Sequence, residues 1–186
     1  ASTKPFGYMK FTPGPGLGGH CIPIDPHYLS WKLKLLDYDA KFIKLASDIN
    51  TKMPRHILNI ISTNLNLTKK NLNGSNILII GAAYKKDIND VRESPAIDII
   101  KLLKTSGSKV EYYDPYVPKI YLEEEVLSSI SNLSTKKLKK YDACVIITDH
   151  SGLDYELIYK SSQLIIDTRN VYKNKTGDHV KRLGQG

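Results

Sequence analysis

Apolar residues change their spacing along the chain, and the change divides it into three zones. Residues 1 to about 27 show no regular spacing. From residue 27 to about 67, apolar residues recur every three or four positions, the period of a helix with one buried face. From residue 71 to about 172, short apolar runs alternate with helical spacing. This alternation predicts an α/β fold in which a helical segment precedes a Rossmann-like, mostly parallel sheet covered by helices.

The helical zone is predicted to contain two segments. The first covers about His27 to Leu36. The apolar stripe of the second consists of Phe42, Leu45, Ile49, Met53, Ile57, Ile60, Ile61 and Leu65. Pro54 lies within this stripe, where it either kinks one long helix or begins another. The stripe fits a core helix and, equally well, a connecting helix that also packs against a partner subunit.

Four apolar runs in the third zone have the length of strands. They are Asn76–Ile80, Lys109–Tyr113, Ala143–Thr148 and Leu164–Asp167. A helix is predicted from Ser94 to Thr105, with Gly107 closing it. Ligands of open parallel sheets bind at the carboxyl ends of the strands, so the residues directly after each run are candidates for ligand contacts. The polar tail from Lys173 is expected to be frayed.

Composition and charge exclude some classes of protein. The 186 residues are 41% hydrophobic and 25% charged, as in globular proteins, and no stretch approaches the roughly 20 apolar residues that span a bilayer. The first ten residues do not have the order of a secretory signal, and they lack an initiating Met, so we interpret the chain as a fragment. The net charge of +8 comes from scattered lysines, which is typical of a solvated surface. We expect neither a membrane nor a nucleic-acid partner, and no metal site.

The two cysteines have different surroundings and are too few for a disulfide framework. Cys144 lies inside an apolar run, which predicts a buried and inert thiol. Cys21 lies in a loop rich in glycine and proline, where packing gives no reason for a thiol. From residue types alone it is either a nucleophile or a structural residue of a tight turn. Reduced thiols favour a cytoplasmic location.

The loop from Pro13 to Pro26 reads P-G-P-G-L-G-G-H-C-I-P-I-D-P. Three of its glycines satisfy G-x-G-x-x-G, but a dinucleotide site also needs a strand before the motif and a helix directly after it. That context is missing, so we reject this loop as an NAD site. It offers instead closely spaced backbone N–H groups, the Cys21 thiol and the Asp25 carboxylate four residues on.

Cationic side chains follow the first and the last predicted strands. Lys85 and Arg92 flank a loop that leads to the N-terminus of the Ser94 helix, which itself favours anions. Arg169 lies just past the last predicted strand. One lysine and two arginines at the strand ends of one sheet would suit a phosphate clamp. For each, a surface cation paired with a neighbouring carboxylate is an equal alternative.

Together these motifs resemble those of the UDP-glucose/GDP-mannose dehydrogenase family. The run G-P-G-x-G-G-H-C-I-P-x-D-P resembles the catalytic loop of members that oxidise UDP-N-acetylhexosamines, such as UDP-N-acetylglucosamine or UDP-N-acetylmannosamine. The run Y-K-K-D-x-x-D-x-R-E-S-P-A resembles the start of the family's UDP-binding domain, and D-x-R-N resembles the last strand of that domain. The resemblance covers nearly the whole chain in the expected order.

The resemblance implies a role for each matched residue. Cys21 matches the nucleophile, Asp25 an aspartate that supports water activation, and Arg92 an arginine that reaches the NAD cofactor. Tyr84 and Lys85 match a Phe-Lys pair that contacts the substrate, with tyrosine a mild departure. The remaining implied substrate contacts are Thr12, Pro13, Gly14, Pro15, Gly16, Leu17, Gly18 and Arg169.

Such enzymes oxidise the C6 alcohol of a nucleotide sugar to a uronic acid, using two NAD and a cysteine thiohemiacetal and thioester. The resemblance assigns residues 1–70 to the catalytic loop and central dimerisation helices, and residues 71–186 to the UDP-binding domain. It implies a homo-oligomer formed through the central helix and a role in polysaccharide biosynthesis. The family's N-terminal NAD-binding domain has no counterpart in these residues. A non-catalytic module that binds nucleotide sugars is the alternative.

Overall fold

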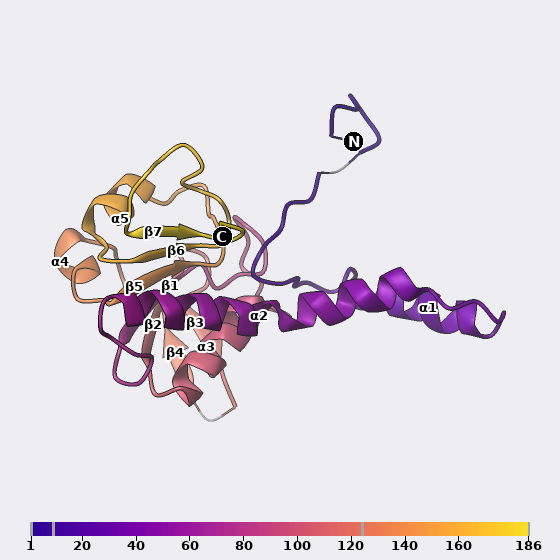
Figure 1. Ribbon diagram of the computed structural model, residues 1–186, viewed down its shortest axis with the longest axis horizontal. Helices are drawn as coiled ribbons and strands as arrows, with labels where there is room; N and C mark the ends of the chain where they lie inside the picture. Colours follow the sequence, from indigo (N-terminus) through magenta and orange to yellow (C-terminus); the bar gives the residue numbers. More distant parts are fainter. Residues whose placement is uncertain (1, 9, 124, 186) are drawn as a thin grey trace.

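The predicted apolar stripe forms one long helix. In the computed structural model, which describes residues 2–8, 10–123 and 125–185, α2 runs from Lys41 to Leu67 and continues through Pro54. The C-terminal half of α2 packs on the α/β domain, whereas its N-terminal half projects away from the domain with α1 (Asp25–Lys34) beside it (Figure 1). Ile61 is fully buried, and Ile49 is 55% exposed. Only the C-terminal half of the apolar stripe is therefore part of the core.

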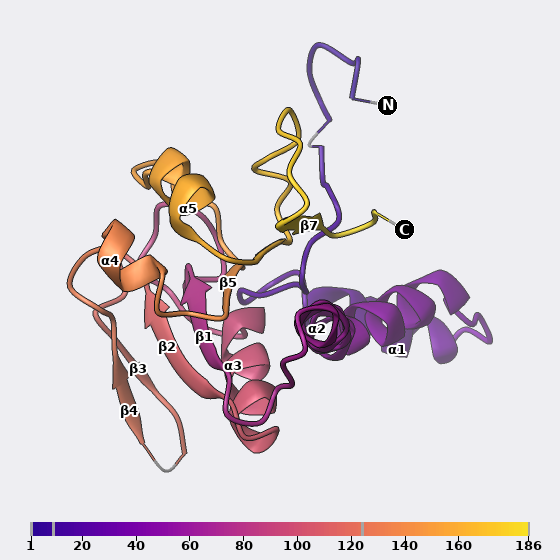
Figure 2. The same ribbon diagram turned by 60° about the vertical axis from the view of Figure 1, so that its left-hand side comes forward.

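Five strands form one parallel sheet in the order β2-β1-β5-β6-β7 (Figure 2). Their bounds are β1 Asn76–Ile80, β2 Lys109–Tyr113, β5 Ala143–Ile146, β6 Ile165–Asp167 and β7 Val180–Arg182. Every neighbouring pair in this sheet is parallel. The four predicted strands are confirmed, with differences of one or two residues at their ends.

Helices cover both faces of the sheet. α2 and α3 (Pro95–Thr105) pack on one face, and α4 (Thr135–Leu138) and α5 (Tyr155–Ser161) pack on the other (Figure 2). β1 serves both cores, because successive strand residues point to opposite faces. Ile77 and Ile79 belong to the core under α2 and α3, whereas Leu78 and Ile80 belong to the other core. The predicted α/β fold is confirmed as a three-layer arrangement.

The polar tail was wrongly expected to be frayed. Val180–Arg182 forms β7, which pairs with β6 and buries Val180. This strand lies at the edge of the sheet, so one apolar side chain is enough to anchor it. The sequence analysis also did not predict the hairpin of β3 (Lys119–Tyr121) and β4 (Val126–Ser128), which follows β2 and precedes α4 in the sequence.

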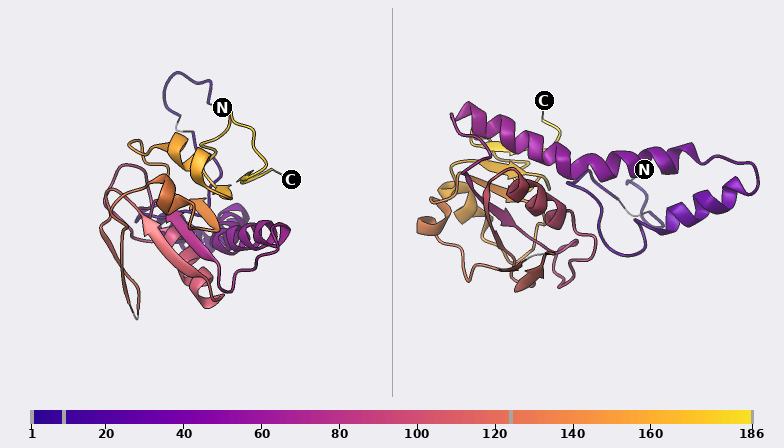
Figure 3. Two further views of the ribbon diagram at one scale, coloured as in Figure 1. Left: turned by 90° about the vertical axis from the view of Figure 1, so that its left-hand side faces the viewer. Right: turned by 90° about the horizontal axis from the view of Figure 1, so that it is seen from below.

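The arm formed by α1 and the first half of α2 extends well beyond the layered domain (Figure 3). α1 begins at Asp25, two residues before the predicted start, because Pro26 occupies its first turn. None of the helices within the described residues combines the length and apolar character needed to cross a bilayer.

Candidate functional site

The glycine-rich loop lies against segments that follow the strands at their carboxyl ends. The N–H of Gly19 donates a hydrogen bond to the carbonyl oxygen of Arg92 at 3.0 Å. Gly16 lies against Pro95, the first residue of α3. The loop therefore passes over the connection between β1 and α3, at the edge of the sheet where ligands of this fold bind.

Two glycines allow this loop to approach its neighbours closely. A Cβ added at Gly14 would lie 2.6 Å from Nη1 of Arg169. A Cβ added at Gly19 would lie 2.8 Å from a ring carbon of Tyr84, and the φ of 93° at Gly19 also favours glycine. The structure thus brings together two pairs of residues predicted to contact substrate: Gly14 with Arg169, and Gly18 with Tyr84.

Arg169 has the surroundings of an anion-binding residue. Its Nε donates to the carbonyl oxygen of Ile147 at 2.6 Å. Burial lowers the pKa of Arg169, and the charge of Asp149 opposes this effect only in part. The Arg169 side chain is half-buried, and within the described part of the chain its terminal nitrogens form no hydrogen bond and no ion pair. A paired surface cation is therefore the wrong description of Arg169, since its fork is available to a ligand.

The other two predicted cations are exposed. Nη2 of Arg92 lies 2.6 Å from Oδ2 of Asp90, and this hydrogen bond raises the pKa of Arg92. Arg92 therefore forms a local surface pair. Lys85 is exposed and takes part in none of the ion pairs formed by residues 2–8, 10–123 and 125–185. Of the two, Lys85 is the one without an ion-pair partner among the described residues.

Cys21 and Asp25 lie together at the start of α1. Backbone N–H groups of Ile24 and Asp25 donate to the carbonyl oxygen of Cys21, at 3.0 and 2.8 Å. The thiol is exposed, with Nδ1 of His20 at 3.8 Å from its sulfur. An open hollow of about 350 Å³ is lined by Cys21, Ile22, Asp25, Pro26 and Leu29. The predicted nucleophile and the predicted carboxylate therefore face the same space.

Cys144 is buried, whereas Cys21 is exposed. Cys144 is fully buried in β5 and accepts a hydrogen bond from Ser162 at 3.3 Å. Burial raises the pKa of the Cys144 thiol to about 11. The predicted burial of Cys144 is confirmed. Because the thiolate is the reactive form, we expect this thiol to be inert.

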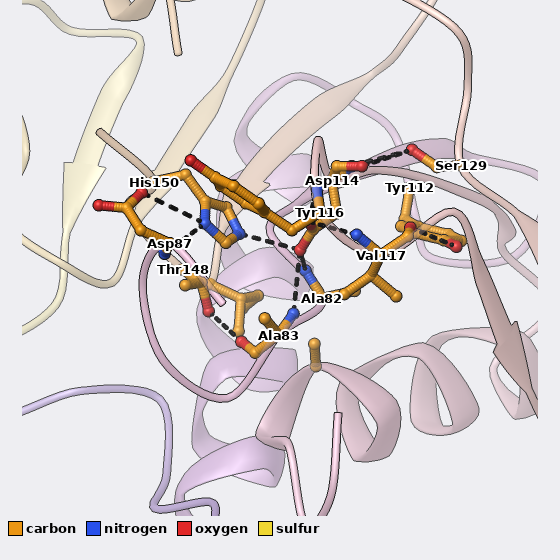
Figure 4. Close-up of polar contacts among 12 residues, drawn as sticks. Ala82, Ala83, Asp87, Tyr112, Asp114, Tyr116, Val117, Ser129, Thr148 and His150 are labelled. Atoms are coloured by element: carbon orange, nitrogen blue, oxygen red, sulfur yellow. Dashed lines mark hydrogen bonds and ion pairs between the residues drawn. The ribbon is translucent and has the colours of Figure 1, made fainter. Parts of the chain in front are cut away.

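The buried pair of Asp114 and His150 was not predicted. Asp114 follows β2 and His150 follows β5, and their side chains are fully buried with Nε2 and Oδ2 2.9 Å apart (Figure 4). Burial alone would raise the pKa of Asp114, but hydrogen bonds from His150 and from backbone amides outweigh burial and lower it. The sequence analysis identified the residues that follow each strand as candidates for ligand contacts, and both residues belong to these segments. It did not predict that the two side chains form a hydrogen bond.

The described residues do not fit a dinucleotide site. Such a site needs a short glycine-rich turn from a strand into a helix. Here residues 81–94 separate β1 from α3, and the Gly14 loop follows no strand.

Comparison with known proteins matches two family models. Residues 78–174 match the UDP-binding domain of the UDP-glucose/GDP-mannose dehydrogenase family, and residues 1–52 match the central domain of that family. UDP-N-acetyl-D-mannosamine dehydrogenase of Methanococcus maripaludis is 34% identical over 94% of the chain. UDP-glucose 6-dehydrogenase of Rickettsia bellii is 34% identical over 97% of it.

The fold is also similar to a solved structure. The UDP-D-ManNAc dehydrogenase of Pyrococcus horikoshii aligns with a TM-score of 0.79 and 32% identity over 99% of this chain. That alignment covers 42% of the Pyrococcus chain, and the Methanococcus and Rickettsia alignments cover 40% and 42% of theirs. The chain thus spans about two fifths of the length of the relatives it matches.

Proposed function

The chain belongs to the UDP-glucose/GDP-mannose dehydrogenase family, and we propose that it supplies the UDP-sugar surface and the catalytic thiol of a nucleotide-sugar 6-dehydrogenase. In this proposal residues 1–70 form the catalytic loop with the central helices, and residues 71–186 form the UDP-binding domain. NAD is the proposed cofactor. The proposed location is the cytoplasm, where Cys21 would stay reduced.

The observation that carries the proposal is one loop that links an anion site to a thiol. At Gly14 the loop contacts the guanidinium of Arg169, and at Gly19 it contacts the ring of Tyr84. Two residues later it presents the exposed thiol of Cys21. A diphosphate held by Arg169 and Lys85 would direct its sugar along this loop, with Thr12 to Gly18 beside the phosphates.

The proposed chemistry of the chain is nucleophilic catalysis. The sulfur of Cys21 bonds to the carbonyl carbon of a C6 aldehyde, and the thiol proton passes to the carbonyl oxygen, so that the aldehyde stays bound as a thiohemiacetal. Loss of a hydride from C6 and of the hydroxyl proton would turn this adduct into a thioester of Cys21. Asp25, which lines the same hollow, then accepts a proton from the water that attacks the thioester, and the C–S bond breaks to release the acid and the thiol. NAD would accept the hydrides, and Arg92 is the residue of this chain proposed to reach it.

We propose a UDP-N-acetylhexosamine as the substrate. The loop reads H-C-I-P around Cys21, the form that the resemblance assigns to enzymes of these sugars. Relatives named for N-acetylmannosamine and for N-acetylglucosamine both match the chain, which leaves either epimer as the proposed sugar. The uronic acid produced would serve polysaccharide biosynthesis.

A homo-oligomer formed through α1 and α2 is part of the proposal. Trp31 on α1 is 61% exposed and Phe42 on α2 is 87% exposed, although both are large and apolar. Burying such side chains against a second copy would be favourable. Sedimentation analysis of wild type and Phe42→Glu tests this, because the substitution should lower the measured mass. A wild-type chain that sediments as a monomer at every concentration would contradict it.

Calorimetric titration tests the binding part of the proposal. UDP-N-acetylglucosamine, UDP-N-acetylmannosamine and UDP should each bind the chain saturably and compete with one another. Polynucleotide binding with a steep salt dependence would contradict the proposal. In the complete enzyme, Cys21→Ser should bind substrate normally and form no acid. Normal acid formation by that variant would leave only the alternative, in which this part of the enzyme is a binding module.

A further inference from the structure

His150 uses both of its ring nitrogens, although it is fully buried and outside every predicted motif. Nδ1 accepts the backbone N–H of Asp87 at 2.9 Å, and Nε2 lies 2.9 Å from Oδ2 of Asp114 (Figure 4). A backbone N–H can only donate, so Nδ1 carries no proton. The proton is therefore on Nε2, which donates to the carboxylate of Asp114.

Asp114 and His150 hold the two ends of one short segment. Oδ2 of Asp114 accepts the N–H groups of Ala82 and Ala83, at 2.7 and 3.0 Å. His150 holds the N–H of Asp87, four residues after Ala83. Residues 84–86 therefore bridge two anchors that share one buried hydrogen bond. Tyr84 and Lys85, both predicted substrate residues, lie on this bridge.

The second anchor lies at a residue that needs support. Asp87 has a φ of 61°, which is uncommon for a residue other than glycine. Such a conformation persists only where the surroundings hold it. Besides His150, Ser151 holds Asp87, since its N–H and its hydroxyl donate to the Asp87 carboxylate at 2.8 and 2.7 Å. Both supports come from the turn after β5.

We infer that His150 is a positioning residue, which sets segment 84–87 for nucleotide-sugar binding through the acceptor at Nδ1. The segment in turn contacts the glycine-rich loop that carries Cys21, because the ring of Tyr84 packs against Gly19. Loss of the Nδ1 acceptor would release Asp87 and with it the position of Lys85. Loss of the Nε2 donor matters less, because Asp114 keeps the backbone amides of Ala82 and Ala83. The inference rests on the proposed function.

Two substitutions separate the two ring nitrogens. His150→Asn can place an oxygen near the position of Nδ1, so it keeps an acceptor for the N–H of Asp87 and loses the donor to Asp114. His150→Gln can reach Asp114 with its amide and lacks an acceptor at the position of Nδ1. His179→Gln is a matched control, because His179 is half-buried, also makes a ring hydrogen bond, and lies at β7 away from this segment.

The measurements are titration with UDP-N-acetylglucosamine, thermal melting, and hydrogen exchange at the Asp87 amide. We expect His150→Gln to weaken binding about tenfold or more and to speed exchange at Asp87, while His150→Asn stays within about threefold of wild type. His179→Gln should bind as wild type does. Equal affinities for both His150 variants, or affinities that simply follow the melting temperatures, would overturn the inference.

The same data separate this inference from the proposed function. If the wild-type chain binds no UDP-sugar, the proposed function is wrong, and so is the proposed role of His150 in binding. The Asp87 exchange rate then still reports on the anchor alone. Fast exchange in His150→Gln and slow exchange in His150→Asn would show that the anchor exists without a binding role. Equal exchange in both would show that there is no anchor.

Discussion

Replacing Arg169 by lysine tests whether the half-buried guanidinium binds the diphosphate of a UDP-sugar. In wild type, Nε donates to the carbonyl oxygen of Ile147, while the two terminal nitrogens form no hydrogen bond within the described part of the chain. Arginine can therefore hold the carbonyl and a phosphate at once. A lysine has one ammonium group at the end of its chain, so it must satisfy either Ile147 or the ligand.

The expected loss corresponds to one hydrogen bond to a charged group. Such a bond contributes about 1.5–3 kcal/mol, which corresponds to roughly 10- to 100-fold weaker binding. The net charge of the site does not change, so a loss of this size would come from geometry. The substitution leaves Lys85, the second proposed cation, unchanged, so any loss of affinity is due to position 169.

Gly14→Ala perturbs the same guanidinium from the other side. The added methyl group would lie 2.6 Å from Nη1 of Arg169, so the end of this side chain must move. Because only a side-chain end is displaced, the fold should tolerate the change while UDP-sugar affinity falls. Gly152→Ala is the matched control, since a Cβ there meets nothing within 4 Å. Arg182→Lys is the control for Arg169→Lys, because Arg182 also donates to a backbone carbonyl.

The assay is calorimetric titration of UDP-N-acetylglucosamine into the five proteins, after circular dichroism has shown equal secondary structure. The reasoning predicts weaker binding by Arg169→Lys and Gly14→Ala, and unchanged binding by the two controls. Affinities of Arg169→Lys and wild type within a factor of about two would remove Arg169 from the binding surface. An equal loss in Arg182→Lys would show that the effect is general rather than local.

Four further outcomes are expected. Iodoacetamide should modify Cys21 in the native chain, while Cys144 reacts only after unfolding, as mass spectrometry of peptides would show. Ile61→Ala should lower the free energy of unfolding by about 2–5 kcal/mol in urea titrations, and Ile49→Ala, on the exposed half of the same helix, should change it little. The pKa of Asp114 is lower in the folded state than its value near 3.8 in the unfolded state, so the ionised carboxylate stabilises the fold above pH 3.8. This stabilisation is lost as the pH falls through the pKa of the folded state. The urea midpoint of Asp114→Asn should therefore vary less with acid pH than that of wild type. The chain mixed with UDP-N-acetylglucosamine and NAD should form no NADH at 340 nm, because the described residues lack a dinucleotide turn; steady formation would mean that the cofactor site was misplaced.

The layered fold was predictable because its central strands are buried on both faces. Ile77 to Ile80 form an unbroken apolar run, as a strand covered by helices on both sides requires. The stripe of α2 was visible for the same reason, since its second half packs on the sheet. β7 escaped prediction because an edge strand needs less burial, and only Val180 is buried in it. The exposed first half of α2 carries the same period as the buried half, so periodicity could not separate them.

The candidate site was predictable to the extent that it depends on local backbone. Glycines in a loop rich in proline indicated close approach, and the structure shows such approaches at Gly14 and Gly19. The position of Arg169 after a strand indicated a ligand contact, and its side chain is half-buried without a carboxylate partner in the described residues. Which loop residue meets which strand end did not follow from spacing, because these residues are more than 60 positions apart.

The pair of Asp114 and His150 depends on sheet order, which local patterns do not contain. β1 lies between β2 and β5, so the turns after β2 and β5 flank the segment that follows β1. A carboxylate from one side and an imidazole from the other can therefore meet beneath that segment and hold its backbone from both ends. The central strand of a parallel sheet gains this support from two neighbours, whereas an edge strand has one. A segment that must keep an uncommon backbone conformation, as segment 84–87 does at Asp87, gains more support after a central strand than after an edge strand, and this chain has it after a central strand.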